Sequence, residues 1–512
     1  MFFLQAIYGI FIASYDTISN NHRWNNYMRM KFKDILKQWP YFGLLLFTAM
    51  FTLLISIRLG LFDKHTIEIK AVVQSLQMQE TWMNIFHQEQ KIGYSHRMIQ
   101  PDNDMYILSE KTYLQLNTMG TIHDLHIQTK AILAKDLSLD QFSFQLNSDP
   151  FKFKVQGTVE LDNLRLIIDN SETTIPLSDK IYLPAALMDA AYALDLKHGE
   201  SQNLKLFDPS TMGMRTVTLF YDGQEQLEIM GSQLLCNVYS MDFIGIKSTA
   251  WIDSTGQIVQ EKGIMGMTLK KTDRQHAYKN LKNIAHKDLI EWVSVPSNVV
   301  LEHQERHSEI TYHIEGEFDK KPLEGGRQIR SGLAYLTIKK ERIPPPPYKV
   351  SMMAKYCQPT IMIPSDNPGI IAQLQKITRN GDSHLVKIKK IMVWLNENIK
   401  KRPVLSVPNA IETLKHKRGD CNEHAVLTAS LLRAAGIPTQ IAAGLVYQKG
   451  RFYYHAWNEV YLNKWITLDV IMNQFPADVT HIRLVKGSPD AQMALLGMIG
   501  NINLKIVEKN HD

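Results

Sequence analysis

The sequence predicts an α+β protein with three parts: an N-terminal transmembrane helix, an antiparallel β-rich middle region, and a C-terminal domain in which helices are followed by antiparallel strands. Three observations predict this arrangement. An uncharged apolar run lies at Pro40–Ile57, short runs of alternating polarity fill residues 81–277, and a helix-like segment followed by strand-like segments begins at Gly419. The last part holds the residues that can carry chemistry.

Length and composition indicate a multidomain globular protein. The chain has 512 residues, of which 45% are hydrophobic and 21% charged. The net charge of +6 is small for this length, and no basic tract with interleaved aromatic residues occurs, so no nucleic acid partner is expected. Cys236, Cys357 and Cys421 are too few for a disulfide framework or a thiolate metal site, and the histidines lack ligand spacing. We therefore expect no metal and no cofactor.

Pro40–Ile57 is predicted to be a single-pass transmembrane helix. The run reaches the length of about 18 apolar residues that a bilayer core requires. More positive charges precede it than follow it, which places residues 1–39 in the cytoplasm and the chain beyond the helix outside. The preceding cations are Arg23, Arg29, Lys31, Lys33 and Lys37. The predicted location is the inner (plasma) membrane, with the bulk of the chain periplasmic or extracytoplasmic.

Two alternatives stay open at this end of the chain. A cleaved signal peptide is the rival of an uncleaved anchor, although the run lacks a small-x-small cleavage site near its end. The apolar residues 1–14 are either an interfacial segment or the product of a start assigned too early, in which case Met28 or Met30 begins the protein.

Residues 65–277 are predicted to form an antiparallel β-rich domain. Short alternating segments recur there and are separated by hairpin signals such as Asp253-Ser254-Thr255-Gly256. One helix interrupts them at Pro184–Lys197, with proline in its first turn. A β-rich linking module is expected at 278–350, and Pro344–Pro347 form a stiff, extended segment that marks its end.

Residues 351–512 make up the predicted C-terminal domain. Its first part reads as three helices, each preceded by an N-cap residue. These helices span 367–379, 383–400 and 409–415. The chain is expected to end with a helix and a strand, at 491–499 and 502–507.

Cys421 opens the helix around which this domain is organised. Asp420 is a natural N-cap, and Gly436 followed by Pro438 ends the helix, since glycine takes the left-handed position and proline cannot continue. A thiol at a helix N-terminus feels the positive end of the helix dipole, which favours the thiolate. The position predicts a Cys421 pKa below the ordinary value and makes the residue a candidate nucleophile. A lone cysteine on an apolar helix face can instead be a small buried hydrophobe.

Three antiparallel strands are predicted after this helix, at Thr439–Tyr447, Phe452–Leu462 and Trp465–Leu468. His455 lies on the second strand and Asp469 directly after the third. Neighbouring strands can thus present an imidazole and a carboxylate side by side, facing the thiol. In a Cys-His-Asp triad the imidazole moves the thiol proton and the carboxylate orients the imidazole.

The motifs of this segment resemble the core of the transglutaminase-like superfamily. They are Arg418-Gly419-Asp420-Cys421, His455-Ala456-Trp457 and Trp465-Ile466-Thr467-Leu468-Asp469. The resemblance covers roughly the last third of the chain and implies a papain-like fold with the triad order Cys, His, Asp. Members commonly have Pro-Thr after the aspartate, where this chain has Val470-Ile471.

The resemblance implies a thiol enzyme that performs acyl transfer or amide or peptide hydrolysis through a thioester on Cys421. Water as acceptor would give an amidase or peptidase, and an amine would give a transamidase. Trp82-Met83 and Trp251-Ile252-Asp253 are similar to segments of bacterial envelope proteins that end in such a domain, which implies a binding or scaffolding β domain. The expected partner of the enzyme is a protein or peptide substrate in the cell envelope. The alternative is a non-catalytic envelope binding or assembly factor whose papain-like lobe only recognises a partner.

Overall fold

The computed structural model describes residues 77–511, apart from short gaps at 88, 169–170, 244–245, 264–265, 280, 282–287, 289, 291–292, 317–322 and 488–493. The predicted transmembrane helix at Pro40–Ile57 and the cytoplasmic segment at 1–39 lie outside this range. Among the described residues, no helix is both long and apolar enough to cross a bilayer.

A fifteen-stranded sheet occupies residues 79–272 and agrees with the predicted β-rich character of this region. Its spatial order is β8-β7-β6-β5-β4-β3-β2-β1-β15-β14-β13-β12-β11-β10-β9. The first eight strands are β1 (Gln79–His87), β2 (Gln90–Asp102), β3 (Met105–Thr118), β4 (Thr121–Ala134), β5 (Leu139–Ser148), β6 (Phe151–Glu160), β7 (Asn163–Ile168) and β8 (Ser171–Pro176). The others are β9 (Ile181–Tyr182), β10 (Ser201–Asp208), β11 (Gly213–Ile229), β12 (Ser232–Phe243), β13 (Ile246–Ile252), β14 (Ile258–Lys262) and β15 (Met267–Thr272).

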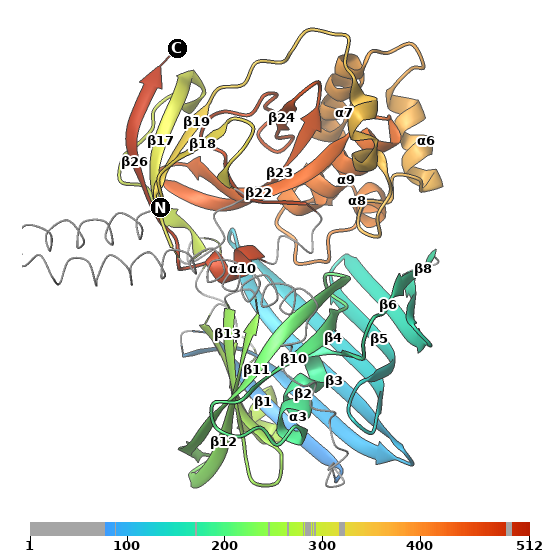
Figure 1. Cartoon of the computed structure of the whole chain (residues 1–512), viewed down its shortest axis with the longest axis vertical. Helices are drawn as coiled ribbons and strands as arrows, with labels where there is room; N and C mark the ends of the chain where they lie inside the picture. Colours follow the sequence, from blue (N-terminus) through green and yellow to red (C-terminus); the bar gives the residue numbers. More distant parts are fainter. Residues whose placement is uncertain are drawn as a thin grey trace, which may run out of the picture. The chain divides into compact units, whose positions relative to one another are not determined.

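The sheet curls (Figure 1) and encloses one large apolar core, and a smaller cluster that includes Cys236 and Trp251 lies apart from it. Alternate residues point inward, as on β6, where Phe151, Phe153 and Val155 are buried and the lysines between them are exposed. Phe142 on β5 faces Phe207 on β10, with ring centroids 5.5 Å apart, so strands far apart in the sheet share one interior. The 3-10 turn η1 (Pro184–Ala186) and helix α3 (Leu187–Ala193) add to this core and are shorter than the predicted helix at Pro184–Lys197.

The C-terminal part has a sheet with the strand order β16-β23-β22-β25, and β24 pairs with β23. Its strands are β16 (Val295–Pro296), β22 (Thr439–Gln448), β23 (Arg451–Tyr461), β24 (Trp465–Leu468) and β25 (Ile482–Gly487). The helices are α6 (Pro368–Ile377), α7 (His384–Asn398), α8 (Ala410–His416) and α9 (Cys421–Ala434). Helix α9 packs against β22 and β23 on one side and against α6, α7 and α8 on the other (Figure 1).

A second sheet in this part joins segments that are distant in sequence. It has the order β18-β19-β17-β26. The strands are β17 (His307–Glu315), β18 (Gln328–Ser331), β19 (Tyr335–Lys339) and β26 (Asn503–His511). Its buried residues, among them Ile310, Leu336 and Leu504, belong to the same apolar cluster as those of α7, α9 and β22.

The remaining elements are short. They are α4 (Arg274–Tyr278), η3 (Gln304–Arg306), η5 (Val350–Cys357), β20 (Lys400–Lys401), β21 (Arg418–Gly419) and α10 (Ala494–Met498). The predicted helix starts are confirmed where a cap residue marked them. Asn367 accepts from Gly369 N–H, Ser383 from Val386 N–H, and Asn409 from Ile411 and Glu412 N–H.

Gly444 on β22 lets β25 approach closely. A Cβ atom there would lie 2.0 Å from the carbonyl oxygen of Ile482 and 2.8 Å from the nitrogen of Leu484. Both are backbone atoms of a neighbouring strand and cannot rotate away. A side chain at this position would therefore push the two strands apart.

We expect Gly444→Ala to destabilise the C-terminal part by on the order of 1–3 kcal/mol, because the added methyl group overpacks a strand pair. Gly381→Ala is the matched control, since nothing lies within 4 Å of its Cβ position. Thermal unfolding of the full chain, followed by tryptophan fluorescence, measures both. Equal melting temperatures for the two variants would show that β22 and β25 can separate without cost.

Candidate active site

The N-terminus of α9 is held by a capping box. Asp420 accepts a hydrogen bond from Asn422 N–H at 2.7 Å, and the Glu423 carboxyl group accepts one from Asp420 N–H at 3.1 Å. Glu423 is buried and also accepts from Ser406 Oγ at 2.6 Å. Gly419 leaves room for this side chain, because a Cβ on Gly419 would lie 2.4 Å from Glu423 Cβ. These contacts therefore fix the start of α9 and, with it, the position of Cys421.

Cys421, His455 and Asp469 come together at this helix end. The Cys421 thiol lies beside the His455 side chain, which acts to lower the pKa of the thiol. His455 Nε2 lies 2.7 Å from Asp469 Oδ2, which leaves Nδ1 for the thiol. Both His455 and Asp469 are buried, whereas Cys421 is partly buried. The order thiol, imidazole, carboxylate is the one that the sequence predicts.

One hydrogen bond ties the sheet to the helix, and two others tie the strands of the sheet together. Asn458 Nδ2 on β23 donates to the carbonyl oxygen of Ala425 on α9 at 2.9 Å, so the strand that carries His455 is anchored one turn from Cys421. Glu459, the next residue, is buried and accepts from Arg483 at 2.6 Å and from Gln440 at 2.7 Å. These bonds lock β22, β23 and β25 together behind the imidazole.

The electrostatics of the thiol differ from the sequence prediction. Burial raises the pKa of Cys421 above its ordinary value, and the Asp420 carboxylate adds to the increase. The hydrogen bond to His455 and a backbone hydrogen bond from Ala456 oppose this change without cancelling it. The expectation of a lowered pKa was wrong, because burial and the charge of Asp420 outweigh the His455 imidazole and the backbone N–H of Ala456.

The His455 imidazole has a raised pKa. Burial alone would lower the pKa of its imidazole, but the charge of Asp469 and the hydrogen bonds to Asp469 and Cys421 raise it to about 10. Asp469 in turn has its pKa lowered, since the two histidines beside it outweigh its own burial. At neutral pH the pair therefore rests as imidazolium and carboxylate.

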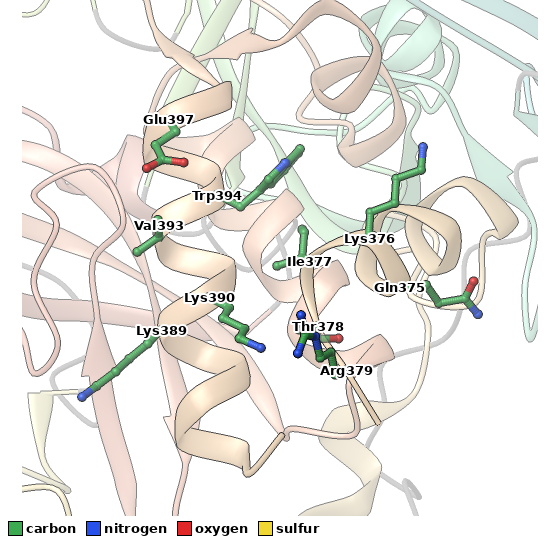
Figure 2. A pocket seen from close by; sticks show the side chains of 10 residues that line it. All are labelled: Gln375, Lys376, Ile377, Thr378, Arg379, Lys389, Lys390, Val393, Trp394 and Glu397. Carbon is green, nitrogen blue, oxygen red and sulfur yellow. The ribbon is translucent and has the colours of Figure 1, made fainter. Parts of the chain in front are cut away.

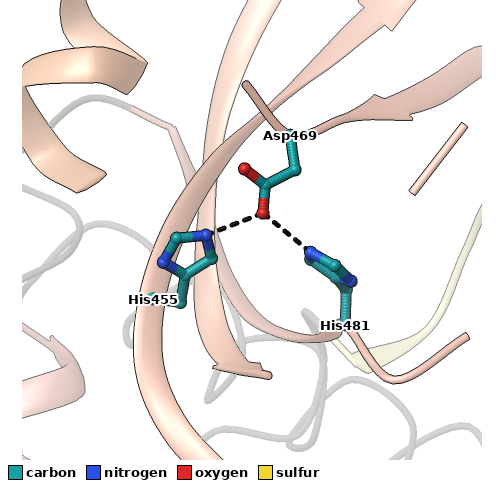
Figure 3. Close-up of side chains that lie close together, drawn as sticks. All are labelled: His455, Asp469 and His481. Atoms are coloured by element: carbon teal, nitrogen blue, oxygen red, sulfur yellow. Dashed lines mark hydrogen bonds and ion pairs between the residues drawn. The ribbon is translucent and has the colours of Figure 1, made fainter. Parts of the chain in front are cut away.

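His481 is a fourth member of this cluster that the sequence reasoning missed. Its Nε2 atom lies 2.9 Å from Asp469 Oδ2, the same oxygen that His455 uses, and its Nδ1 atom lies 3.2 Å from Asp478 Oδ1 (Figure 3). It lies just before β25 and is completely buried. The Asp478-x-Thr480 segment signals an Asx-turn but no site, so no local pattern could have identified His481.

Asp469 is also held by its own turn. Its Oδ1 atom accepts from Met472 N–H at 3.0 Å, and its backbone pairs with Gln474 in both directions. The chain therefore fixes the carboxylate even though Val470-Ile471 replaces the Pro-Thr pair common in the resembled family.

The three residues His455, Asp469 and His481 offer ligand atoms within 4.8 Å of one another, close enough to hold a metal ion. In Figure 3, however, the two Nε2 atoms approach one carboxylate oxygen from opposite sides. They point at that oxygen and not at a common centre. A histidine must be neutral to ligate, whereas the pKa of each is raised here. The geometry suits a hydrogen-bonded network.

A separate groove of about 610 Å³ lies between α6 and α7 (Figure 2). Its lining includes Lys376, Arg379 and Lys389, together with Trp394. Lys390 also lines it but is paired with Asp382 at 2.7 Å. The lining contains no member of the predicted triad.

Comparison with known families decides the assignment. Residues 371–470 match the sequence model of the transglutaminase-like superfamily, a segment that contains Cys421, His455 and Asp469. This segment is a transglutaminase-like domain. Within the domain, α9 carries the thiol and β23 carries His455. His481 lies beyond the matched residues.

Comparison with curated proteins gives no match. Several solved structures share parts of the fold at low similarity. A β-barrel-like protein of unknown function from Brucella abortus is 12% identical, with 39% of this chain and 97% of that chain covered and a TM-score of 0.31. A candidate cysteine protease from Cytophaga hutchinsonii is 15% identical, with 40% and 88% covered and a TM-score of 0.26. A candidate protease from Parabacteroides distasonis is 10% identical, with 74% and 68% covered and a TM-score of 0.21. Similarities at this level carry no argument about the reaction.

The charge on His481 makes a testable contribution to stability. Burial acts to lower its pKa, but hydrogen bonds to Asp469 and Asp478 raise it to about 9. An unfolded histidine titrates near 6.5, so this contribution is fully present below about pH 6.5 and is lost as pH rises to about 9. Its size is on the order of 3 kcal/mol.

We therefore expect His481→Gln, which has no titrating group, to melt well below wild type at pH 6 and closer to wild type at pH 9.5. Melting curves of the two full-length proteins across this range measure the difference. A melting-temperature gap that is constant with pH would contradict a charged His481 in the folded state.

Proposed function

We propose that the transglutaminase-like domain is a cysteine-dependent enzyme that transfers acyl groups through a thioester on Cys421. The observation that supports this most is the series of the Cys421 thiol, the His455 imidazole beside it and the Asp469 carboxylate that is hydrogen-bonded to that imidazole, at the N-terminus of a helix. A purely binding lobe has no physical need for that series. In this proposal Cys421 is the nucleophile, His455 the proton carrier, and Asp469 its orienting partner.

The proposed reaction begins when Cys421 Sγ attacks the carbonyl carbon of an amide and forms a tetrahedral oxyanion. The backbone N–H of Cys421, in the first turn of α9, is placed to stabilise that oxyanion. His455 gives its proton to the leaving amine, and the C–N bond breaks to leave a thioester. Water or a second amine then attacks the thioester and gives up a proton to His455, and the C–S bond breaks to release the acyl product and restore the Cys421 thiolate. Hydrolysis produces an acid, and attack by an amine produces a new amide.

The protonation states define when this chemistry can start. A thiol with a raised pKa beside an imidazolium must lose one proton to reach the reactive thiolate–imidazolium pair. That form grows as pH rises toward the raised pKa of Cys421 and is lost when His455, whose pKa is about 10, releases its proton. Cys421 and His455 titrate as a coupled pair, so both pH limits are properties of the pair and not of either residue alone.

The acyl-transfer proposal predicts a covalent intermediate. We expect p-nitrophenyl acetate to acetylate Cys421 in the full chain, with a rate that rises from pH 7 to pH 9 and a product that hydroxylamine cleaves. Peptide mass spectrometry locates the acetyl group. Cys421→Ala should abolish it, and Cys357→Ala, which lies outside the site, is the matched control. Acetylation that persists in Cys421→Ala at the same rate would sink the proposal.

His455→Ala tests the imidazole separately. The change removes a hydrogen bond and a positive charge that lower the pKa of Cys421, so the pKa should rise further. We expect iodoacetamide to alkylate Cys421 about tenfold more slowly at pH 8, the effect of one pKa unit. Cys357 in the same sample provides an internal reference. Equal alkylation rates of Cys421 in wild type and His455→Ala would show that the two side chains are not coupled.

We further propose that the domain acts on protein or peptide substrates in the bacterial cell envelope and that Pro40–Ile57 anchors it to the inner membrane. The apolar run and its preceding cations support this location. Alkaline phosphatase fused after residue 70 or at the C-terminus should be active, because that enzyme works only outside the cytoplasm. An inactive phosphatase with an active cytoplasmic reporter at either point would overturn this topology.

A further inference from the structure

His481 is buried beside the proposed triad and takes no part in the chemistry described so far. We propose that His481 is a positioning residue that holds Asp469 in register with His455 and, through its positive charge, sets the pH range in which Cys421 is reactive. The inference deepens the proposed function and rests on it. It is argued from the hydrogen bonds around the ring and from the charges that face it.

The protonation state of His481 follows from its partners. Nε2 faces Asp469 Oδ2 at 2.9 Å and Nδ1 faces Asp478 Oδ1 at 3.2 Å. An ionised carboxylate can only accept hydrogen bonds, so both ring nitrogens must donate. An imidazole with two N–H groups is an imidazolium. The ring is therefore a fixed positive charge between two carboxylates.

Asp478 is ionised for the same reason. Its Oδ1 atom accepts from the backbone N–H and the hydroxyl group of Thr480, at 2.9 and 2.6 Å, and its Oδ2 atom accepts from Gln474 Nε2 at 2.8 Å. Every contact is with a donor. The hydrogen bond from His481 to Asp478 thus fixes the ring against the turn that precedes β25. The hydrogen bond from His481 to Asp469 then restricts the position of the Asp469 carboxylate.

The charged groups around His481 come from several elements. Asp469 follows β24, His455 lies on β23 with its ring centroid 6.2 Å away, and Asp478 belongs to the same turn as His481. Arg327 donates to the carbonyl oxygen of His481 at 3.2 Å and lies 3.8 Å from the Glu341 carboxylate. Trp457 meets the ring edge-on at 5.2 Å and helps to exclude water.

Two consequences follow for the proposed site. First, Asp469 Oδ2 is clamped between two N–H donors while Oδ1 is held by Met472 N–H, so the carboxylate cannot rotate. Second, the negative charge of Asp469 is shared between two imidazolium rings. A second positive ring only 6.2 Å from His455 adds positive charge to the cluster, which favours the negatively charged thiolate of Cys421.

Two substitutions separate the hydrogen bond from the charge. His481→Gln keeps a donor near the position of Nε2 but carries no charge, whereas His481→Phe keeps the ring volume and removes both. We expect both variants to shift the pH midpoint of iodoacetamide alkylation at Cys421 upward by about one unit, which is about tenfold slower alkylation below the midpoint. We expect the limiting acetylation rate at high pH to be close to wild type in His481→Gln and at least tenfold lower in His481→Phe.

His307→Gln is the matched control, because His307 is also a buried histidine and lies on β17, outside the cluster. Melting temperatures identify effects on stability alone, which would not move a pH midpoint. If the alkylation midpoint of His481→Gln and His481→Phe equals that of wild type and of His307→Gln, the inference is wrong. If Cys421 is alkylated but never acetylated in the wild type, the proposed function fails, and the midpoint shift still tests His481.

Discussion

A single carboxylate oxygen, Oδ2 of Asp469, accepts hydrogen bonds from two histidines that arrive on different strands. The strands of the C-terminal sheet position the three side chains for these hydrogen bonds. β23 brings His455, the end of β24 brings Asp469, and the turn before β25 brings His481. Two buried positive rings would repel each other without the shared carboxylate, and the carboxylate would be costly to bury without the rings.

The polar groups around the Cys421 thiol are also held by hydrogen bonds. Asp420 accepts a hydrogen bond from the N–H of Asn422, and Glu423 accepts one from the N–H of Asp420, so this capping box fixes the point at which α9 begins. The carboxyl group of Glu423 is buried, and burial together with the neighbouring Asp420 raises its pKa well above the ordinary value. The N-terminus of α9 therefore determines the position of Cys421 more than it favours the charged form of the thiol. His455 is the group that offsets the desolvation of the thiol.

Much of the C-terminal part could be predicted from the sequence, because its signals are local. Asp420, Gly436 and Pro438 mark the ends of α9, and the three strands after it form an antiparallel set as expected. The proximity of Cys421, His455 and Asp469 followed from that order. The pKa of Cys421 did not, since it depends on how much of the domain encloses the thiol. His481 had no signal either, because the pairing of β22 with β25 that brings it to the site leaves no trace in local periodicity.

The pairing of β17 with β26 has a consequence for how the chain is made. Asn298 near β17 and Ile506 on β26 bond to each other across 208 residues. While a ribosome is still translating the helices, β17 has only β19 beside it, and its other edge offers unpaired backbone groups to any passing strand. Contacts this distant in sequence form slowly, so that edge stays open well after α9 can fold. A binding partner that covers such an edge would protect the nascent domain from aggregation during this interval.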